Sequence, residues 1–489
     1  MQNRAIGGAG PIRAAAPCTA AILAVFLSGC AATRPDPQAE AAAALAVGLD
    51  GAIAFRAEGG PVDEPAGEQP ADSLTLAEAI RRGVTTDPGL QAALARVRIA
   101  MADADQARLL PNPVLSIVLR WGPGKPQIEA SLAQDLIQAL QIPRRSSAAD
   151  HRLRQAAAEA VTVALDVTAE LQERYVSVQA QDALIPLLQE RLTLLRKLIE
   201  TARARREAGE GTATDVTILD AQRVELEVEI AAAELQRGGD RIRLARLIGQ
   251  PSSAAVWMLE PWSAPMLAAE PESRWIDVAL STRPEVQAVA WQLAALGDDY
   301  ALARLLPWEG AGAGIEAQRD DDWFAGPSVS TPIPVFDMGQ ARRARITAEQ
   351  IESRHHLTLA RRKVVEEVRV AYQTLAAGRA NLDRIRNELI PLQQQRRRVT
   401  EDVYLVERDI TPLLLAEQDL RTAQARAIDA ERQAVIALIR LQRAVGGPGV
   451  ARAITSPPTP PTADRSAPPA PSAPSDAAAI ERSRTAIRN

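Results

Sequence analysis

The sequence predicts a mainly α-helical protein with a small β part, built from long coiled-coil hairpins and four short strands. The 489 residues are 47% hydrophobic but only 3% aromatic, so Ala, Leu, Val and Ile supply most of the apolar surface. That composition favours thin helical packing over a wide globular core. Long heptad patterns and an internal duplication, described next, support the same fold class.

The duplication covers about residues 73–450. Asp87–Ala92 corresponds to Arg283–Ala288, and Ala107–Pro111 is repeated identically as Ala303–Pro307 at the same offset of 196 residues (303 minus 107). We expect a first repeat at 73–272 and a second at 273–450. Each should begin with a helix pair, at 75–87 and 90–110 and again at 273–282 and 285–306.

The sequence of each repeat then predicts a long helical hairpin, at 146–249 in the first and at 340–446 in the second. Apolar residues recur every seven positions in the first hairpin, which is coiled-coil spacing; they are Leu171, Val178, Ile185, Leu192 and Ile199, with Leu188 and Leu195 in the companion seam. Pro186 and Pro391 lie inside these helical patterns. Because proline removes a backbone donor, we expect a kink or short break at each.

Two regions, 113–134 and 311–332, alternate apolar and polar residues as half-buried strands do. The alternation assigns seven residues to a lipid-facing surface: Leu115, Ile117, Leu119, Trp121, Ile128, Leu132 and Trp323. Such strands with terminal aromatic residues are typical of outer-membrane barrels, and the alternative is the edge strands of a small soluble sheet. Since the smallest barrels have about eight strands, membrane insertion would require several chains.

The N-terminus resembles a bacterial lipoprotein signal peptide. Arg4 and Arg13 precede a largely apolar run that ends in Leu27-Ser28-Gly29-Cys30. We expect residues 1–29 to be removed, Cys30 to carry the lipid (palmitate), and 30–72 to form an extended tether; the alternative makes Cys30 a small residue ending a signal or anchor helix. The Pro-rich residues 451–489 predict a disordered tail.

Composition and motifs argue against several functions. The net charge of −5 and the lack of a long basic block argue against a nucleic-acid partner. Three histidines (His151, His355 and His356) are too few and too scattered for a convincing metal site, and no phosphate loop or nucleophile elbow occurs. We therefore expect no enzyme activity, cofactor or metal; Asp320–Asp322 is interpreted as a hydrated turn, with a loosely held cation as the alternative.

These features together resemble the TolC-like outer-membrane factors of tripartite efflux pumps and type I secretion systems. The resemblance rests on the duplication, the Asp87-Pro88 and Arg283-Pro284 junctions, the two Arg-Leu-Leu-Pro segments, the paired hairpins and the lipobox. Leu109–Pro113 and Ile142–Arg145 look most like the heavy-metal-efflux branch (CzcC- and CusC-like). The second repeat departs from the first at Trp308-Glu309-Gly310, which leaves the start of its first strand undefined.

The resemblance implies a homotrimer in the outer membrane with a long periplasmic extension. Four strands per chain would make a twelve-stranded transmembrane β-barrel, continued by an α-barrel tunnel of twelve long helices. Its partners would be outer-membrane lipid, a periplasmic adaptor (membrane fusion) protein and an inner-membrane pump that supplies the energy. The cargo, metal cations or drugs, stays open.

The hairpin tips are the predicted working parts, as a periplasmic gate or as adaptor-docking sites. The candidates are Glu207, Gly209, Glu210, Gly211 and Asp215 at one tip and Arg408 and Asp409 at the other. The alternative for each is an ordinary cap or solvated turn charge. For the whole chain the leading hypothesis is a passive duct; a periplasmic coiled-coil adaptor or scaffold lipoprotein and a lipid-anchored envelope enzyme are the competing ones.

Overall fold

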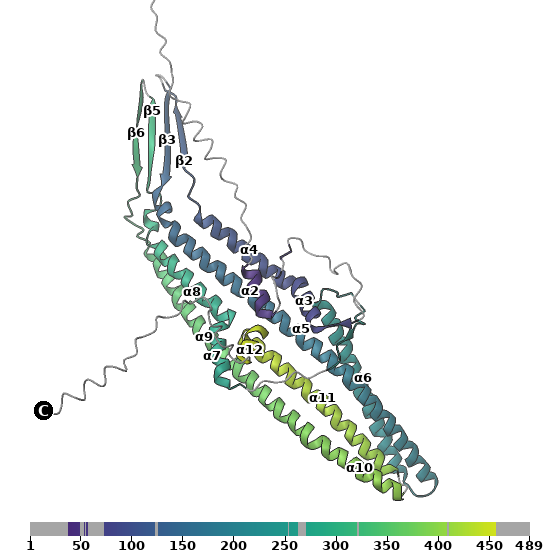
Figure 1. The fold of residues 1–489 in the computed structure, drawn as a ribbon. Coiled ribbons are helices and arrows are strands. Elements are labelled where there is room, and N and C mark those ends of the chain that lie inside the picture. Colours follow the sequence, from purple (N-terminus) through teal and green to yellow (C-terminus); the bar gives the residue numbers. More distant parts are fainter. Residues whose placement is uncertain are drawn as a thin grey trace, which may run out of the picture.

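The computed structural model is an elongated molecule with a four-stranded sheet at one end and two helical hairpin tips at the other (Figure 1). It describes residues 38–48, 53, 55–56, 73–122, 126–252, 254–262, 270–319, 322–407 and 410–455. Cys30, Asp320, Asp321, Arg408 and Asp409 lie outside the described residues. Among the described helices, none is long and apolar enough to cross a membrane.

The two repeats have matching element orders. The first comprises α3 (Leu76–Thr86), α4 (Pro88–Arg108), β2 (Val114–Arg120), β3 (Gln127–Asp135), α5 (Leu136–Glu207) and α6 (Ala213–Leu247). The second comprises α7 (Glu272–Thr282), α8 (Pro284–Ala303), the 3₁₀ turn η1 (Leu306–Trp308), β5 (Gly312–Arg319), β6 (Trp323–Ser330), α9 (Gln340–Arg384), the π-turn η2 (Ile385–Leu389), α10 (Ile390–Glu407) and α11 (Thr411–Val445). The turn η1 occupies the position where the second repeat departs from the first, and β5 begins four residues after it.

Helix α5 begins ten residues earlier than the predicted start at 146. Asp135, the last residue of β3, caps it by accepting a hydrogen bond from the Gln138 amide at 2.9 Å. A strand that ends in a capping residue needs no connecting loop, so the chain passes directly from sheet to helix. The 72 residues of α5 extend about 108 Å at 1.5 Å per residue.

The two prolines at which a kink or break was predicted, Pro186 and Pro391, behave differently. Helix α5 continues through Pro186, where a kink or break was predicted. In the second repeat the π-turn η2 comes just before Pro391, and the Ile390 amide bonds to the Ile385 carbonyl, five residues back. The wider turn accommodates the proline ring and its missing donor, so the predicted break is present in the second hairpin.

Helix α5 is the central element, because α4, α6, α8 and α11 all pack against it. The predicted heptad residues Leu171, Val178, Leu188 and Leu195 are at most 1% exposed, which confirms the coiled-coil seam. Buried Tyr175 donates from Oη to the Leu74 carbonyl at 2.8 Å and fixes α5 to the short parallel pair β1 (Ser73–Leu74) and β4 (Met258–Leu259).

The described chain begins and ends with a short helix, and both helices lie about halfway along the molecule. The sequence predicts an extended tether and a disordered tail there. Helices α2 (Gln38–Val47) and α12 (Pro448–Thr455) contact each other, and α2 also packs on α5. A Cβ at Gly447 would lie 2.3 Å from the Ala46 carbonyl oxygen, so only glycine permits this approach. Burial of Ala43, Ala44 and Val47 against the core favours helix over extended chain here.

Candidate functional site

The four strands form one antiparallel sheet in the order β2-β3-β5-β6. Pairing aligns Leu115, Leu132, Ile315 and Pro327 in one row. The next row on the same face is Ile117, Ala130, Ala317 and Ala325, and the one beyond it is Leu119, Ile128, Arg319 and Trp323. Directly paired residues share a face. The predicted apolar positions within the strands therefore form one continuous surface, while Trp121 follows the end of β2 and is 76% exposed.

The opposite face is mainly polar. Ser116, Ser131 and Glu316 form one of its rows, and Arg120 pairs with Glu129 at 3.0 Å near one end. On the apolar face Arg319 lies over the Trp323 ring, 5.9 Å from its centroid. The sheet thus has one apolar and one polar side, as alternation requires.

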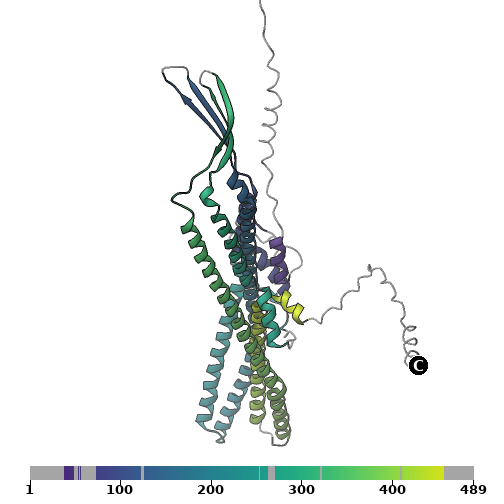
Figure 2. The same ribbon diagram turned by 90° about the vertical axis from the view of Figure 1, so that its left-hand side faces the viewer.

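Strands β2 and β6 are the open edges of this sheet. Figure 2 shows the four strands as a curved ribbon whose two edges do not meet. Open edges with an exposed apolar face are not typical of a complete soluble protein, because the backbone donors and acceptors along the edge strands are unpaired.

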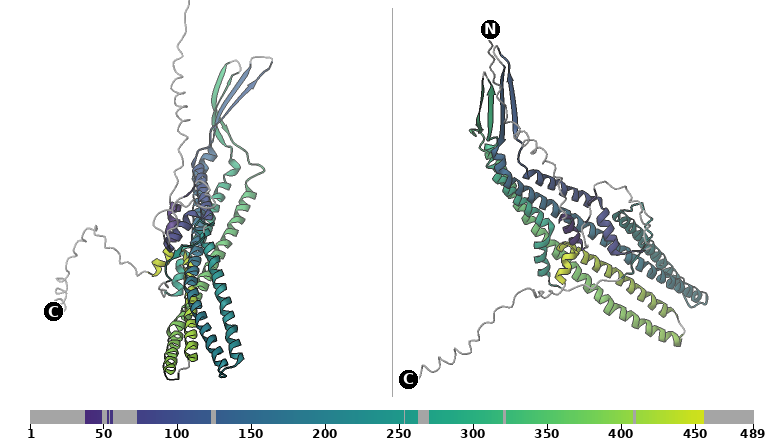
Figure 3. Two further views of the ribbon diagram at one scale, coloured as in Figure 1. Left: turned by 90° about the vertical axis from the view of Figure 1, so that its right-hand side faces the viewer. Right: turned by 45° about the horizontal axis from the view of Figure 1, so that its top comes forward.

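The helical layer has open ends too. In the hairpin half, α5 packs against α6 and α11, and α11 packs against α9 and α10. The views in Figure 3 show the two hairpins side by side. Helix α6 and the α9–α10 pair are therefore the two ends of a row.

Sequence reasoning missed an apolar stripe on α6, which we define as Val224, Val228, Leu235 and Ile242. All four are at least 50% exposed. At about 100° per residue they lie opposite the face that packs on α5; that buried face includes Leu226, Ile230, Ala233 and Leu244. The seven-residue spacing of the last three stripe residues was the signal that could have revealed it.

The other end of the row has exposed apolar residues as well. Leu359 and Val370 on α9 are 62% and 59% exposed, and Leu392 and Val399 on α10 are 61% and 55% exposed. Leu392 and Val399 are also seven residues apart. Both ends of the helical row thus present coiled-coil-like surfaces with no partner in the described part of this chain.

At the first hairpin tip, Gly209 adopts φ +81°, which glycine tolerates without strain. Thr212 and Asp215 form a capping box at the start of α6, with the Thr212 amide donating to Asp215 at 3.0 Å. The hydrogen bond from the Thr212 hydroxyl lowers the pKa of Asp215. Glu207, the last residue of α5, and Glu210, in the turn that follows, are both exposed. Gly211 lies close against the backbone of Arg206.

The capping box means that Asp215 already has a local structural role. Arg408 and Asp409, at the second tip, lie outside the described residues. Within the second hairpin, Arg397 on α10 pairs with Glu417 on α11 at 2.9 Å, and Arg396 pairs with Asp419. The structure therefore brings the first tip's candidates together in one turn, without testing the predicted gate.

The two hairpins are joined by a ladder of three ion pairs, each linking an acid on α5 to an arginine on α11. Asp166 pairs with Arg443 at 2.6 Å, Glu173 with Arg440 at 2.9 Å, and Glu190 with Arg421 at 2.9 Å. Along the ladder the residue numbers fall on α11 as they rise on α5, as antiparallel packing of the two helices requires. The ladder restrains one hairpin against the other.

At the top of this ladder lies a half-buried charge network. Arg283, 4% exposed, pairs with Glu367 and with Glu285 at 2.8 Å, and Arg443 also contacts Glu285 at 2.7 Å. Burial raises the pKa of Glu285, but the hydrogen bond from Arg283 and the charges of Arg443 and Arg283 outweigh it and lower that pKa to about 2. The network links α8, α9, α11 and, through Asp166, α5.

The histidines do not converge. His151 stacks on Trp291 with 5.5 Å between ring centroids, and its Nε2 lies 3.7 Å from Asp298. His355 and His356 are exposed on α9. Among the described residues no group of three His, Cys, Asp or Glu is placed to hold a metal ion.

Together these features define a class: an open sheet with one apolar face on a long paired-hairpin stem, as in outer-membrane efflux proteins. Residues 275–447 match the family model described as outer membrane efflux protein. Over 283 residues the chain is 26% identical to the outer membrane efflux protein BepC of Brucella suis, covering 56% of this chain and 61% of BepC. The chain thus spans less than two thirds of that relative's length.

Solved structures share the fold. VceC, an outer membrane protein of Vibrio cholerae, superposes with a TM-score of 0.61 at 18% identity, covering 76% of this chain and 96% of VceC. The MtrE outer membrane channel of Neisseria gonorrhoeae gives a TM-score of 0.60 at 17% identity, covering 76% and 89%. These comparisons confirm the predicted fold class, the resemblance to the TolC-like outer-membrane factors and the outer-membrane location.

Proposed function

We propose that this protein is the outer-membrane channel of a tripartite efflux or type I secretion system, a passive trimeric duct from periplasm to exterior. The observation that carries the proposal is that both layers of the molecule are open at both ends. The sheet ends at β2 and β6, and the helical row ends at the α6 stripe and at α9–α10. A ring of identical chains satisfies all four ends at once.

Ring closure fixes which surfaces meet. Strand β6 of one copy pairs with β2 of the next, and the α6 stripe packs against the exposed apolar residues of α9 and α10. Three copies give twelve strands, enough to close a barrel with its apolar face outward, toward lipid, and its polar face toward the lumen. Leu115, Ile117, Leu119, Trp121, Ile128, Leu132 and Trp323 are the lipid-facing residues in this arrangement.

The remaining roles belong to the same proposal. The hairpin tips form the periplasmic gate and the docking site for a periplasmic adaptor, which links the duct to an inner-membrane pump. The protein itself catalyses no reaction and binds no cofactor. Cys30 carries the lipid anchor, and the cargo is a metal cation or a drug.

Cross-linking of the two sheet edges tests ring closure. Val118 and Phe324 lie at the same level and on the same face of the sheet, but on opposite edge strands. Because closing a barrel tilts the strands and staggers their register, several double variants are compared, each combining Ser116→Cys or Val118→Cys on β2 with Phe324→Cys, Ser328→Cys or Ser330→Cys on the same face of β6. We expect at least one of them, treated with a bis-maleimide in membranes, to give covalent dimers and trimers. Each single-cysteine variant serves as the control and should give none.

The second test of the proposal is planar-bilayer recording of the purified full-length protein. Discrete conductances from cross-linked trimers support the duct. A protein that stays monomeric and forms no pore would overturn this proposal in favour of the adaptor or scaffold hypothesis.

A further inference from the structure

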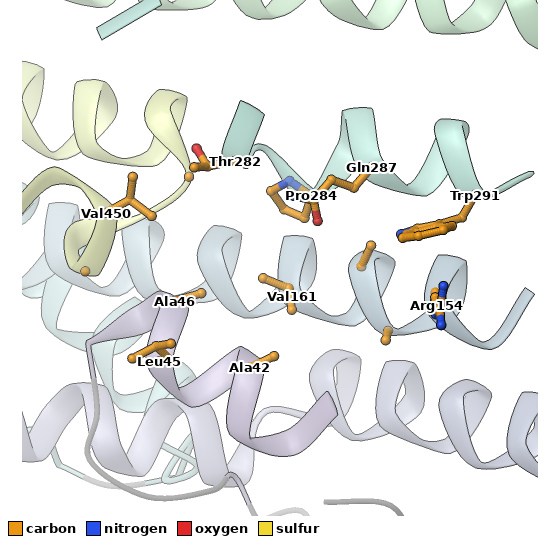
Figure 4. Close-up of a pocket in the computed structure, with 14 residues that line it drawn as sticks. Ala42, Leu45, Ala46, Arg154, Val161, Thr282, Pro284, Gln287, Trp291 and Val450 are labelled. Carbon is orange, nitrogen blue, oxygen red and sulfur yellow. The ribbon is translucent and has the colours of Figure 1, made fainter. Parts of the chain in front are cut away.

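An elongated trough lies at mid-length of the molecule, between α2, α5, α8 and α12 (Figure 4). Its volume of about 610 Å³ falls within the roughly 300–1,000 Å³ of small-molecule sites. It is remote from the strands and from the hairpin tips, so the duct does not account for it. Its walls exist only because α2 and α12 fold onto the stem.

The trough is apolar along most of its length. Leu45 and Ala46 of α2 form one wall and Val161 of α5 the floor. Ala157, one turn before Val161 on α5, also lines the trough. Val450 of α12 lies toward one end. Leu45 is 74% exposed, so its side chain is available to cover a ligand.

The opposite end of the trough is positively charged. Arg154 and Trp291 lie there, with the Arg154 guanidinium over the indole ring, 4.8 Å from its centroid. Among the described residues that line the trough, Arg154 is the only ionisable one. The trough therefore has a cationic end and an apolar body.

Arg154 differs from its neighbours on α5 in having no acid partner. Arg144 pairs with Asp298 at 3.0 Å and Arg152 with Asp299 at 2.5 Å. For Arg154 the described part of the chain provides no carboxylate within ion-pair distance. An anion from outside the protein can therefore bind this guanidinium without displacing an internal partner.

We propose that this trough binds a free single-chain anionic amphiphile of the fatty-acid type. The carboxylate accepts hydrogen bonds from Arg154, and the alkyl chain lies on Ala157 and Val161 toward Val450, covered by Leu45. The arrangement combines an apolar body, which the chain removes from water, with one charged group that fixes the chain's direction.

Photolabelling tests the site with the full-length protein in nanodiscs of zwitterionic phosphatidylcholine. The probe is a diazirine-bearing C16 fatty acid, and labelled peptides are mapped by mass spectrometry. We expect labels on the α5 peptide that contains Ala157 and Val161 and on the α2 peptide that contains Leu45. Labelling of these peptides by a C16 diazirine alcohol should be about fivefold to tenfold weaker, because charge-assisted hydrogen bonds are the stronger ones.

Arg154→Gln should lower acid labelling to the level of the alcohol, and Arg154→Lys should retain most of it. Arg152→Gln is the matched control, because it removes a nearby charge that does not line the trough. Absence of label on the α2 and α5 peptides, or equal effects of Arg154→Gln and Arg152→Gln, would overturn the proposal. A two-chain diazirine phosphatidylglycerol that labels as well as the acid would also overturn it, in favour of membrane lipid.

Discussion

Single residues acquire their meaning here from the partners that the fold gives them. Ile117 and Ser116 are neighbours in sequence, yet strand pairing places Ile117 in a row with Ala130 and Ala317, and Ser116 in a row with Ser131 and Glu316. Glu285 is one acid among many in the sequence, but the folded chain brings Arg283 and Arg443 to it.

We predict that Ile117→Arg weakens the assembled trimer and that Ser116→Arg is much milder. A lipid-facing arginine near the bilayer midplane costs about 2–4 kcal/mol per site, whereas a lumen-facing one stays in water. The fraction of trimer that survives a detergent and temperature series measures the difference. Equal tolerance of the two substitutions would reject the assignment of faces.

We also predict an acid-dependent loss of stability that Glu285→Gln removes. The pKa of Glu285 is lowered to about 2 from 4.5, so by linkage its ionised form contributes roughly 3 kcal/mol of folding stability above pH ~4.5. That contribution falls as the pH drops from about 4.5 toward 2, because the unfolded state takes up the proton first.

Melting of the helical signal between pH 7 and pH 2.5 measures this effect. The difference in melting temperature between wild type and Glu285→Gln should become smaller below pH ~4.5. Glu366→Gln, an exposed acid on α9, is the control and should change little at any pH. A difference in melting temperature that stays constant down to pH 2.5 would contradict the lowered pKa of Glu285.

At the scale of elements, the two hairpins are not equivalent. The first continues through Pro186, while the second contains the π-turn η2 before Pro391. The first hairpin carries the α6 stripe and the second ends the row at α9–α10. The two repeats share one order of elements but expose apolar residues on different helices.

We predict that Leu235→Glu on the α6 stripe prevents trimer formation while each chain keeps its helical content. Leu235 is 79% exposed in the single chain, so the substitution does not disturb the core. In the trimer it would bury a charge without a partner, which is costly. Gln236→Glu adds the same charge beside the stripe and is the control. Native mass spectrometry showing intact Leu235→Glu trimers would remove α6 from the interface.

Helix α2 allows a second prediction at this scale. Gly447 has φ +114°, and a Cβ there would lie 2.3 Å from the Ala46 carbonyl oxygen and 2.6 Å from Leu165 Cδ2. We expect Gly447→Ala to cost about 1–3 kcal/mol and to detach α2 from the stem.

Limited proteolysis within 38–48, followed over time, reports detachment of α2. Gly297→Ala is the control: beyond the neighbouring backbone of its own helix, no described atom lies within 4 Å of the added Cβ, so in mid-helix it should be neutral or stabilising. Identical cleavage rates for wild type and Gly447→Ala would show that α2 does not depend on this contact.

At the scale of the whole molecule, the prediction concerns the gate. If charges at the hairpin tips hold neighbouring helices together, replacing Asp215, Arg408 and Asp409 jointly with Ala should raise the conductance of the trimer in a planar bilayer. The effect should exceed that of each single change, because groups in one network couple. High salt should also loosen the closed wild-type channel by screening exposed pairs.

The capping box supplies the control for this experiment. Thr212→Ala removes the cap of α6 but leaves the Asp215 charge, so it separates a weakened helix start from a lost gate charge. Conductance that rises equally in Thr212→Ala and the triple variant would assign the effect to the cap. A triple variant that forms normal trimers and conducts like wild type would move the gate elsewhere.

Sequence alone determined the features that depend on local pattern. The heptads that include Leu171 and Leu188 predicted the buried seam, and the alternation through Leu115 and Ile117 predicted two-faced strands, because periodicity fixes which side chains share a face. The duplication predicted the order of elements in both repeats. Pro391, which lies just after the π-turn η2, marked the break in the second hairpin.

Tertiary structure alone decided the features that depend on contacts between distant segments. The Ala-rich residues 38–47 favour a helix locally, but helices as short as α2 and α12 are marginal on their own, and packing of α2 on α5 and of the two helices on each other stabilises them. Arg443 on α11 contacts Glu285 from 158 residues away in the sequence, and the α6 stripe is recognisable as an exposed apolar face only once the other face of α6 is known to be buried. Periodicity fixes faces within an element, whereas long-range packing determines what each face meets.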